Sequence, residues 1–221
     1  PPREIRRTRK TRSWRAHAMA RSRNLLEPAT LLNIGVRVAP NGDTQLRSGM
    51  AQVHLIIGPV GAGKSTFANT LCQQHGAIRL TLDDWMTQLF RPDRPEHDVM
   101  PWYLERVERC ITQIWKLTLD LLDHGSDVVL EIGLIQRAQR QRFYQRVDDA
   151  ERALRVYWVD APREVRRARV AKRNLERGQT FSMEVPPDFF ELASNLWEPP
   201  DAGETVARDV CVLESGQPQA T

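Results

Sequence analysis

The segment that constrains this chain most is 58–65, GPVGAGKS, which satisfies the pattern G-x-x-x-x-G-K-S/T. The preceding stretch 53–57, VHLII, has the composition of a buried strand. The residues that follow the glycines predict a helix from Lys64 to about residue 74. A strand, a glycine-rich loop and a helix in this order are typical of a phosphate-binding loop (P-loop), so we expect nucleotide binding.

The residue types in this loop match the chemistry of phosphate binding. Glycines allow several backbone N–H groups to converge on phosphate oxygens, and the positive end of the following helix points at the same anion. Lys64 can bridge the β- and γ-phosphates, Ser65 can bind magnesium, and Thr66 can contact the α-phosphate. We therefore expect ATP and Mg²⁺ as cofactors. The predicted nucleotide-binding residues are Gly58, Gly61, Ala62, Gly63, Lys64, Ser65 and Thr66.

The charge of the chain is divided unevenly along its length. The 221 residues include 32 Lys and Arg and 28 Asp and Glu, a net charge of +4. Residues 1–49 hold 11 of the basic and 3 of the acidic side chains, which leaves 21 basic and 25 acidic in residues 50–221. The second part is therefore slightly acidic, a balance that does not favour broad contact with a nucleic-acid backbone. We expect no nucleic-acid partner for it.

This division suggests three parts of the chain. Residues 1–49 are rich in arginine and turn-forming residues, and we predict a basic N-terminal extension that is disordered or not native to the functional unit. The alternative is a basic arm that binds nucleic acid or acidic lipid. We expect residues 50–214 to form the P-loop domain and residues 215–221 to form a loose tail.

The cysteines and the hydropathy pattern bear on the environment of the protein. Cys72, Cys110 and Cys211 do not form a metal-binding spacing, and we interpret them as reduced thiols. No apolar run approaches the roughly 18–20 residues that a membrane span needs. We therefore expect a cytoplasmic protein without a membrane partner, and the sequence leaves its oligomeric state open.

From residue 50 onward, short apolar runs alternate with helical patterns, which is typical of an α/β fold around a parallel sheet. An amphipathic pattern, with apolar residues recurring at helical spacing, predicts a long helix near 100–124. The predicted strands lie near 52–57, 77–82, 127–132, 154–159 and 207–213, and the predicted helices near 64–74, 100–124, 136–150, 162–177 and 187–197.

Acidic residues follow two of the predicted strands. Asp83 and Asp84 come after the second strand, and Glu131 lies at the end of the third. Ligands of open α/β sheets bind at the carboxyl ends of the strands. One aspartate could accept a proton from a hydroxyl that attacks phosphorus, and Glu131 could hold a magnesium-bound water or a substrate group. The alternatives are helix capping by an aspartate and simple solvation of Glu131.

Two groups of arginines lie downstream of these acids. Arg137 and Arg140 are one helical turn apart and could bind substrate or phosphate, or could be solvated. Further along, Arg166, Arg169 and Arg173 share one face of the helix predicted at 162–177. Guanidinium groups suit the charge on a migrating phosphoryl group. We therefore predict an Arg-rich lid, with a solvated basic helix as the alternative.

The motifs together resemble the AAA_33 group of P-loop kinases. The resemblance rests on the P-loop, on 82–84 (LDD) with 89–90 (LF) after it, on the strand at 128–131 and on Arg169-x-x-x-Arg173. Similar proteins include the 5′-kinase domain of polynucleotide kinase, chloramphenicol phosphotransferase and zeta-toxin-like kinases. The likeness covers roughly residues 52–180. It implies a P-loop NTPase fold with a five-stranded parallel sheet of order 2-3-1-4-5, flanked by helices.

The resemblance also implies roles for particular residues. The family's catalytic aspartate stands shortly before a Leu-Phe pair, and this register favours Asp83 over Asp84. The family's motif continues as Asp-x-x-Arg, but Met86 occupies the arginine position here, which argues against a nucleic-acid end as the acceptor. Relatives usually carry Asp where this chain has Glu131. The positions that match the family's other basic sites are Arg137, Arg140, Arg169 and Arg173.

The sequence therefore predicts an ATP-dependent phosphotransferase that moves the γ-phosphate to a hydroxyl of a small molecule. In this hypothesis Lys64 binds the phosphates, Asp83 deprotonates the acceptor hydroxyl, and Ser65 and Glu131 hold Mg²⁺. The lid arginines Arg169 and Arg173 close over the phosphoryl group, while Asp84, Glu131, Arg137 and Arg140 bind the substrate. Two alternatives are an ATP-binding switch or ATPase without a small-molecule acceptor, and a nucleic-acid end kinase. The sequence does not identify the acceptor.

Overall fold

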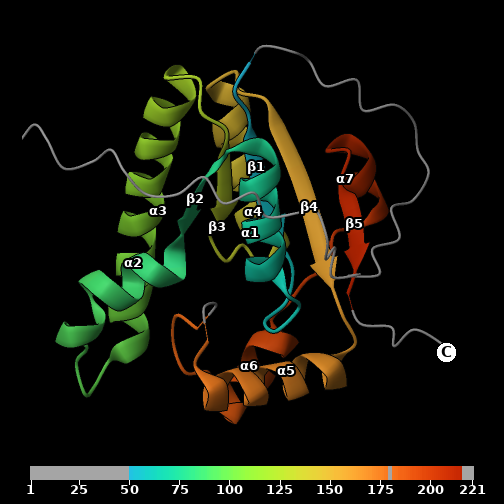
Figure 1. Ribbon diagram of the computed structural model, residues 1–221. Helices are drawn as coiled ribbons and strands as arrows, with labels where there is room; N and C mark the ends of the chain where they lie inside the picture. Colours follow the sequence, from blue (N-terminus) through green and yellow to red (C-terminus); the bar gives the residue numbers. More distant parts are fainter. Residues whose placement is uncertain (1–49, 179–180, 216–221) are drawn as a thin grey trace, which may run out of the picture. The chain divides into compact units, whose positions relative to one another are not determined.

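A parallel sheet of five strands forms the centre of the P-loop domain. The computed structural model describes residues 50–178 and 181–215. The sheet order is β2-β3-β1-β4-β5, and every neighbouring pair of strands is parallel (Figure 1). The predicted fold class and strand order are therefore confirmed. The strands are β1 (Val53–Ile57), β2 (Ile78–Thr81), β3 (Val128–Glu131), β4 (Leu154–Asp160) and β5 (Cys211–Glu214).

Helices cover both faces of this sheet and its carboxyl end. In Figure 1, α1 lies in front of the sheet and α4 behind it, while α5 and α6 lie at the end toward which the strands point. The described helices are α1 (Lys64–His75), α2 (Leu82–Leu89), the short 3₁₀ helix η1 (Arg91–Asp93), α3 (Val99–Asp123), α4 (Arg137–Asp149), α5 (Arg163–Glu176), α6 (Pro187–Asn195) and α7 (Ala202–Ala207). Among these described helices, no segment has both the length and the apolar character of a membrane span.

The central position of β1 explains its nearly continuous apolar sequence. All five of its residues are buried, because helices pack on both faces of a parallel sheet. On one face, alternate β1 residues such as Leu55 pack with Ile114 of α3 and Phe143 of α4. On the other face, Ile56 packs with Ala68 of α1. This packing fixes the end of β1, and hence the start of the P-loop, at the carboxyl edge of the sheet.

The structure differs from the predicted elements in two places. The helix α2 begins at Leu82, directly after β2, so Asp83 and Asp84 lie in a helical turn rather than at a strand end. The short helix α7 ends at Ala207, the residue at which the last strand was predicted to begin. Asp201 caps α7 by accepting a hydrogen bond of 2.7 Å from the Glu204 amide, which explains why a helix starts there. The strand β5 consequently begins only at Cys211.

Candidate active site

The P-loop is packed closely against the elements that follow it in the fold. Gly58 has φ 146° and Gly61 has φ 79°, both in a region that disfavours other residues. A Cβ atom at Gly58 would lie 2.1 Å from the Val159 carbonyl oxygen, and one at Gly61 would lie 2.7 Å from that of Arg166. Glycine is therefore required at both positions by conformation and by space.

Lys64 lies against the backbone of the same loop. Its Nζ donates hydrogen bonds of 2.9 Å to the carbonyl oxygens of Gly58 and Pro59. Burial lowers the pKa of this ammonium, while the nearby carboxylates of Glu131 and Asp83 act in the opposite direction. The lysine is thus held at the loop with two acidic groups near it.

The first turn of α1 is joined to the end of β3 through Ser65 and Glu131. Ser65 Oγ donates a hydrogen bond of 2.7 Å to Glu131 Oε1. Arg79 in β2 pairs with the other carboxylate oxygen, Oε2, at 2.7 Å through Nη2 and 3.2 Å through Nε. Sequence reasoning missed Arg79. The one available signal was a charged residue within the short strand IRLT, whose role depends on a partner 52 residues away.

Asp83 lies in the first turn of α2, near these charged groups. Its side chain is exposed to solvent, although the protein atoms around it desolvate the carboxyl group. This desolvation, together with the charge of Glu131, raises the pKa of the Asp83 carboxyl, against the opposing effect of Lys64 and Arg173. A raised pKa makes a carboxylate a stronger base, which is a property expected of a group that accepts a proton.

Asp84 has a different environment from its neighbour. It accepts a hydrogen bond of 2.8 Å from Ser182 Oγ, in the segment between α5 and α6. Neither aspartate caps α2, because the capping position belongs to Thr81 and no side chain there makes a capping bond. The structure therefore separates the two aspartates, with Asp83 near Lys64 and Asp84 bound to Ser182.

Tyr103 of α3 is a second residue that sequence reasoning did not single out for the site. Burial and the charge of Asp83 raise the pKa of its hydroxyl to about 12. The phenol consequently stays protonated at neutral pH, as a potential hydrogen-bond donor beside Asp83.

The basic face of α5 contacts the P-loop directly. Arg166 is buried and donates to the carbonyl oxygens of Ala161, at 3.0 Å, and Val60, at 3.1 Å. Arg169 donates to Ser215 Oγ at 2.9 Å and to the Ala62 carbonyl oxygen at 3.4 Å. Both arginines therefore hold the backbone of the loop from outside. Ser215, placed at the start of the predicted tail, itself donates to the Ala62 carbonyl at 2.6 Å.

Arg173 is the arginine of α5 that lies nearest to the acidic groups. Burial lowers the pKa of its guanidinium, and the charges of Asp83 and Glu131 oppose this effect. Its buried Nε has no hydrogen-bond partner among the described residues. A buried donor without a partner is costly in a folded protein and commonly marks a place for a ligand or water.

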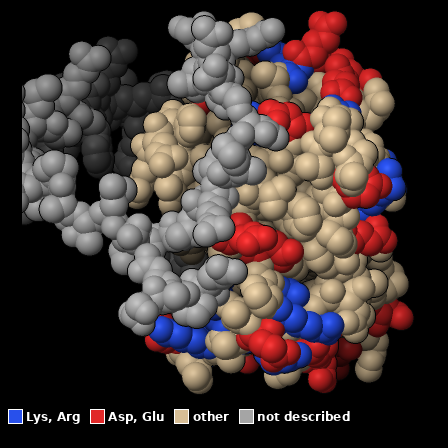
Figure 2. Space-filling model, turned by 90° about the vertical axis from the view of Figure 1, so that its right-hand side faces the viewer, with Lys and Arg blue, Asp and Glu red and all other residues tan. Residues whose placement is uncertain are grey.

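The remaining arginines of α5 are engaged with acidic neighbours. Arg167 and Arg163 both pair with Glu191 of α6, and Arg167 also pairs with Glu164. Figure 2 shows one face of the molecule, and at its lower end, at the level of α5 and α6, basic and acidic side chains lie next to one another. The helix is thus neither a freely solvated basic helix nor a uniformly basic surface.

Arg137 and Arg140 pair with acidic residues at the other end of the sequence. Arg137 forms an exposed ion pair of 2.5 Å with Asp201. Arg140 is fully buried and makes a bidentate pair with Glu204, at 2.6 Å through Nε and 2.8 Å through Nη2. The expected substrate contact of Arg140 is corrected here, because its guanidinium is enclosed and its donors are used within the fold.

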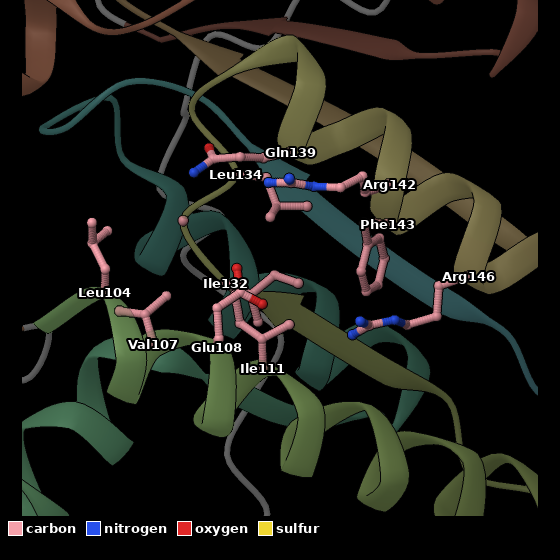
Figure 3. A pocket seen from close by; sticks show the side chains of 11 residues that line it. Leu104, Val107, Glu108, Ile111, Ile132, Leu134, Gln139, Arg142, Phe143 and Arg146 are labelled. Carbon is pink, nitrogen blue, oxygen red and sulfur yellow. The ribbon is translucent and has the colours of Figure 1, made fainter. Parts of the chain in front are cut away.

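A hollow of about 430 Å³ opens between α3 and α4. Figure 3 shows Leu104, Val107 and Ile111 of α3 on one side of it and Phe143 with the charged Arg142 and Arg146 of α4 on the other. Ile132, directly after β3, lies between them. Two residues of the wall of the hollow, Ile132 and Leu104, are the sequence neighbours of Glu131 and Tyr103. The apolar side chains of the lining are Leu104, Val107, Ile111, Ile132, Leu134 and Phe143, the polar ones are Glu108, Gln139, Arg142 and Arg146, and Gly133 completes it.

The parallel sheet, the glycine loop after β1 and the lysine at the start of α1 define a P-loop NTPase. Residues 53–188 match the model of the AAA_33 family, described as an AAA domain. The chain belongs to this family.

Solved structures with the same fold include several proteins of low sequence identity. A candidate kinase from Chloroflexus aurantiacus is 14% identical, with a TM-score of 0.58, and the match covers 78% of this chain and 92% of that chain. Kti12 from Chaetomium thermophilum, solved with ADP-AlF3, is 14% identical with a TM-score of 0.57, over 76% and 92% of the two chains. A chain of the Pnkp1/Rnl/Hen1 RNA repair complex is 20% identical with a TM-score of 0.50, over 70% and 46%. No curated protein matches the chain.

Proposed function

We propose that this protein is an ATP-dependent phosphotransferase that moves the γ-phosphoryl group to a hydroxyl of a small molecule. The observation that carries the proposal is the position of Asp83. Its carboxylate lies within the electrostatic influence of the P-loop lysine Lys64 and of Arg173, and its pKa is raised. A P-loop protein that only binds ATP needs no such base at this position, whereas one that hydrolyses ATP uses a side chain to orient the attacking water, so the acceptor panel below separates transfer from hydrolysis.

The nucleotide-binding part of the site follows from the P-loop. Lys64, now bonded to loop carbonyls, would turn to the β- and γ-phosphates, and the loop amides would donate to phosphate oxygens. The donor set at Ser65 and Glu131, a hydroxyl and a carboxylate 2.7 Å apart, fits Mg²⁺, which prefers oxygen ligands. When bound, Mg²⁺ would neutralise charge on the β- and γ-phosphates.

Asp83 supplies the proton acceptor for the transfer. Its carboxylate takes the proton from the acceptor hydroxyl as that oxygen bonds to the γ-phosphorus and the bond to the ADP oxygen breaks. Arg173 has a donor without a partner among the described residues, and we assign it to the transferring phosphoryl group. Arg169 holds the Ala62 carbonyl, so in our proposal it supports the loop and reaches the phosphates only if that contact is released.

The acceptor site is proposed at the start of the hollow between α3 and α4. Tyr103, near Asp83, would donate a hydrogen bond to the acceptor, and the apolar lining would take an apolar part of it. Arg142 and Arg146 outnumber the one acidic lining residue, Glu108, and would favour an acceptor that also carries a negative group. These features support a small molecule.

Two observations speak against a nucleic-acid end as the acceptor. Residues 50–221 contain more acidic than basic side chains. In addition, the arginines of α5 other than Arg173 are engaged with Glu191, Glu164 and the P-loop carbonyls. Counterion release at a nucleic-acid backbone needs several free cations, so this helix is a poor site for it.

The test measures phosphoryl transfer by the full chain with ATP, Mg²⁺ and a panel of small hydroxylated metabolites and antibiotics. Mass spectrometry identifies any compound that gains a phosphoryl group, and Asp83→Asn is compared with Asp84→Asn as the matched control. We expect transfer by the wild type, a loss of about 10²–10⁴-fold in Asp83→Asn, as general-base removal predicts, and a much smaller loss in Asp84→Asn.

Other outcomes would contradict the proposal. Tight ATP binding with basal hydrolysis that no compound stimulates and that Asp83→Asn leaves unchanged would favour the nucleotide switch. Phosphorylation of a DNA or RNA end, and of no small molecule, would favour the end kinase. Full transfer by Asp83→Asn would overturn the assignment of the base.

A further inference from the structure

The buried strand β1 contains one polar residue, His54, in the sequence VHLII. Its side chain is fully buried on the face of the sheet that α1 covers. There its ring lies with its centroid 4.8 Å from that of His75, in the last turn of α1. A histidine in such a strand needs partners for both ring nitrogens, so its surroundings are informative.

The partners of His54 form a built arrangement rather than a single contact. Nδ1 lies 3.2 Å from the Tyr157 hydroxyl, and Nε2 lies 3.3 Å from Oδ2 of Asp127. The other carboxylate oxygen of Asp127, Oδ1, accepts a hydrogen bond of 2.8 Å from the Gln52 amide. His54 is therefore held in place through Nδ1 and Asp127 through Oδ1. Their remaining polar atoms, His54 Nε2 and Asp127 Oδ2, face each other.

This geometry is close to that of two ligands on one metal ion. Zinc binds imidazole nitrogen and carboxylate oxygen at about 2.0–2.2 Å, so tetrahedral ligands lie about 3.3–3.5 Å apart. His54 Nε2 and Asp127 Oδ2, at 3.3 Å, satisfy this spacing. The Tyr157 hydroxyl and the Gln52 amide occupy the positions of the outer contacts that usually orient metal ligands.

His75 provides the third ligand. One donor atom from each of His54, His75 and Asp127 lies within 4.8 Å of the others. The His75 side chain is exposed, so it can turn toward the other two without disturbing the core. Gly76, with φ 62°, ends α1 directly after it and holds the end of the helix at this point.

We propose that His54, His75 and Asp127 form a binding site for one divalent transition-metal ion of the zinc class. Two imidazoles and one carboxylate suit Zn²⁺ and its neighbours in the first transition series, whereas Mg²⁺ prefers oxygen ligands throughout. The exposed side of His75 leaves the fourth position to water or to an exogenous ligand. The site is separate from the one proposed for magnesium at Ser65 and Glu131.

The position of this site in the fold gives it a structural consequence. His54 lies near the start of β1, which leads to the P-loop, and Asp127 directly precedes β3, which ends at Glu131. His75 ends the helix that begins at Lys64. A bound ion would therefore join α1 to the amino-terminal ends of two central strands, at the end of the sheet opposite the P-loop, and would stabilise the folded chain.

The test adds Co²⁺ or Zn²⁺ to the full chain without nucleotide and with excess Mg²⁺, which occupies the oxygen-rich site. Co²⁺ absorption reports nitrogen and oxygen ligation, and titration calorimetry gives the Zn²⁺ affinity and stoichiometry. His75→Ala removes the exposed ligand, and His124→Ala removes another exposed histidine as the matched control. We expect one ion per chain, binding at least about tenfold weaker in His75→Ala, and no change in His124→Ala.

Two further measurements separate ligation from damage to the fold. Tyr157→Phe keeps the ring but loses the hydroxyl at Nδ1, and should weaken Zn²⁺ binding by about 10–100-fold while the protein stays folded by circular dichroism. Absence of Co²⁺ ligand-field bands in the folded wild type would overturn the proposal. Equal Zn²⁺ affinity in wild type and His75→Ala would also overturn it, since the ion would then be held elsewhere, for example by cysteine thiols.

Discussion

The hydroxyl of Ser65 donates a hydrogen bond of 2.7 Å to the carboxylate of Glu131. This bond joins the first turn of α1 to the last residue of β3, and β3 pairs with β1 in the sheet. The same carboxylate pairs with Arg79 of β2. Three neighbouring strands and the P-loop helix thus place one acidic group at the point where magnesium would be needed.

Glu131→Gln should weaken Mg²⁺-dependent ATP binding or turnover by about 10–100-fold, as removal of a residue that orients metal ligands does. The amide can still accept the Ser65 hydrogen bond, but it has no charge for the ion or for Arg79. Titration calorimetry with ATP in the presence and absence of Mg²⁺ measures the effect. Glu105→Gln, which removes an exposed carboxylate of α3, is the control. An unchanged Mg²⁺ dependence in Glu131→Gln would show that this carboxylate has no part in metal binding.

Lys64→Met should lower the affinity for ATP with little change in folding. A hydrogen bond to a charged group contributes about 1.5–3 kcal/mol, which corresponds to a loss of about 10–150-fold in affinity. Binding of a fluorescent ATP analogue measures the loss, and Lys116→Met, at an exposed site on α3, serves as the control. Equal affinities in the two variants would contradict the phosphate contact assigned to Lys64.

Asp83→Asn should raise the melting temperature at neutral pH in the absence of nucleotide. Desolvation and the charge of Glu131 raise the pKa of Asp83 in the folded chain. As the pH rises, the unfolded chain therefore loses this proton first, and unfolding is favoured. This loss of stability, which the charged Asp83 causes in the folded wild type, is absent below about pH 4, the ordinary pKa of aspartate. It builds as the pH rises toward the raised folded pKa and is constant above it.

Thermal melts between about pH 3 and pH 8 measure this difference, a window that brackets the ordinary aspartate pKa. The gain of Asp83→Asn over wild type should vanish at the acid end, and Asp93→Asn, at an exposed position, controls for the change in net charge. A constant difference at every pH would argue against a raised pKa. For the same reason, the acid limb of kcat/KM in wild type should lie above the pKa of an ordinary aspartate.

Arg140→Met should destabilise the fold by about 3–5 kcal/mol, because it leaves the Glu204 carboxylate buried without its partner. Arg137→Met, which breaks the exposed pair with Asp201, should cost about 0–1 kcal/mol. Urea unfolding of both variants measures the contrast. The double variant Arg140→Met, Glu204→Leu should recover much of the loss. Similar costs for the two single variants would contradict the distinction between a buried structural pair and an exposed one.

Local sequence patterns were sufficient for the P-loop and for most strands and helices. The run VHLII and the glycines after it are defined within about a dozen consecutive residues, and the structure places β1 and α1 there. The order of the strands was available only through the family resemblance. The helices α2 and α7 were missed, because α2 follows β2 without a loop and α7 has only six residues.

Pairs of charged side chains that are far apart in the sequence could not be predicted from local sequence patterns. Arg140 has the same sequence context as a solvated arginine, and only the approach of α7 places Glu204, 64 residues away, against it. Arg79 likewise meets Glu131 because β2 and β3 are neighbours in the sheet.

The sequence by itself determined the phosphate-binding loop, the α/β pattern and the acidic residue at the end of the third strand, because each depends on residues within one strand or one helical turn. Only the tertiary structure decided which charged side chains share an environment. It separated Asp83 from Asp84 and placed Arg173, rather than Arg140, near the acids. It also brought His54 and Asp127 together. These pairings follow from packing between elements that are far apart in the chain, and local composition carries no information about them.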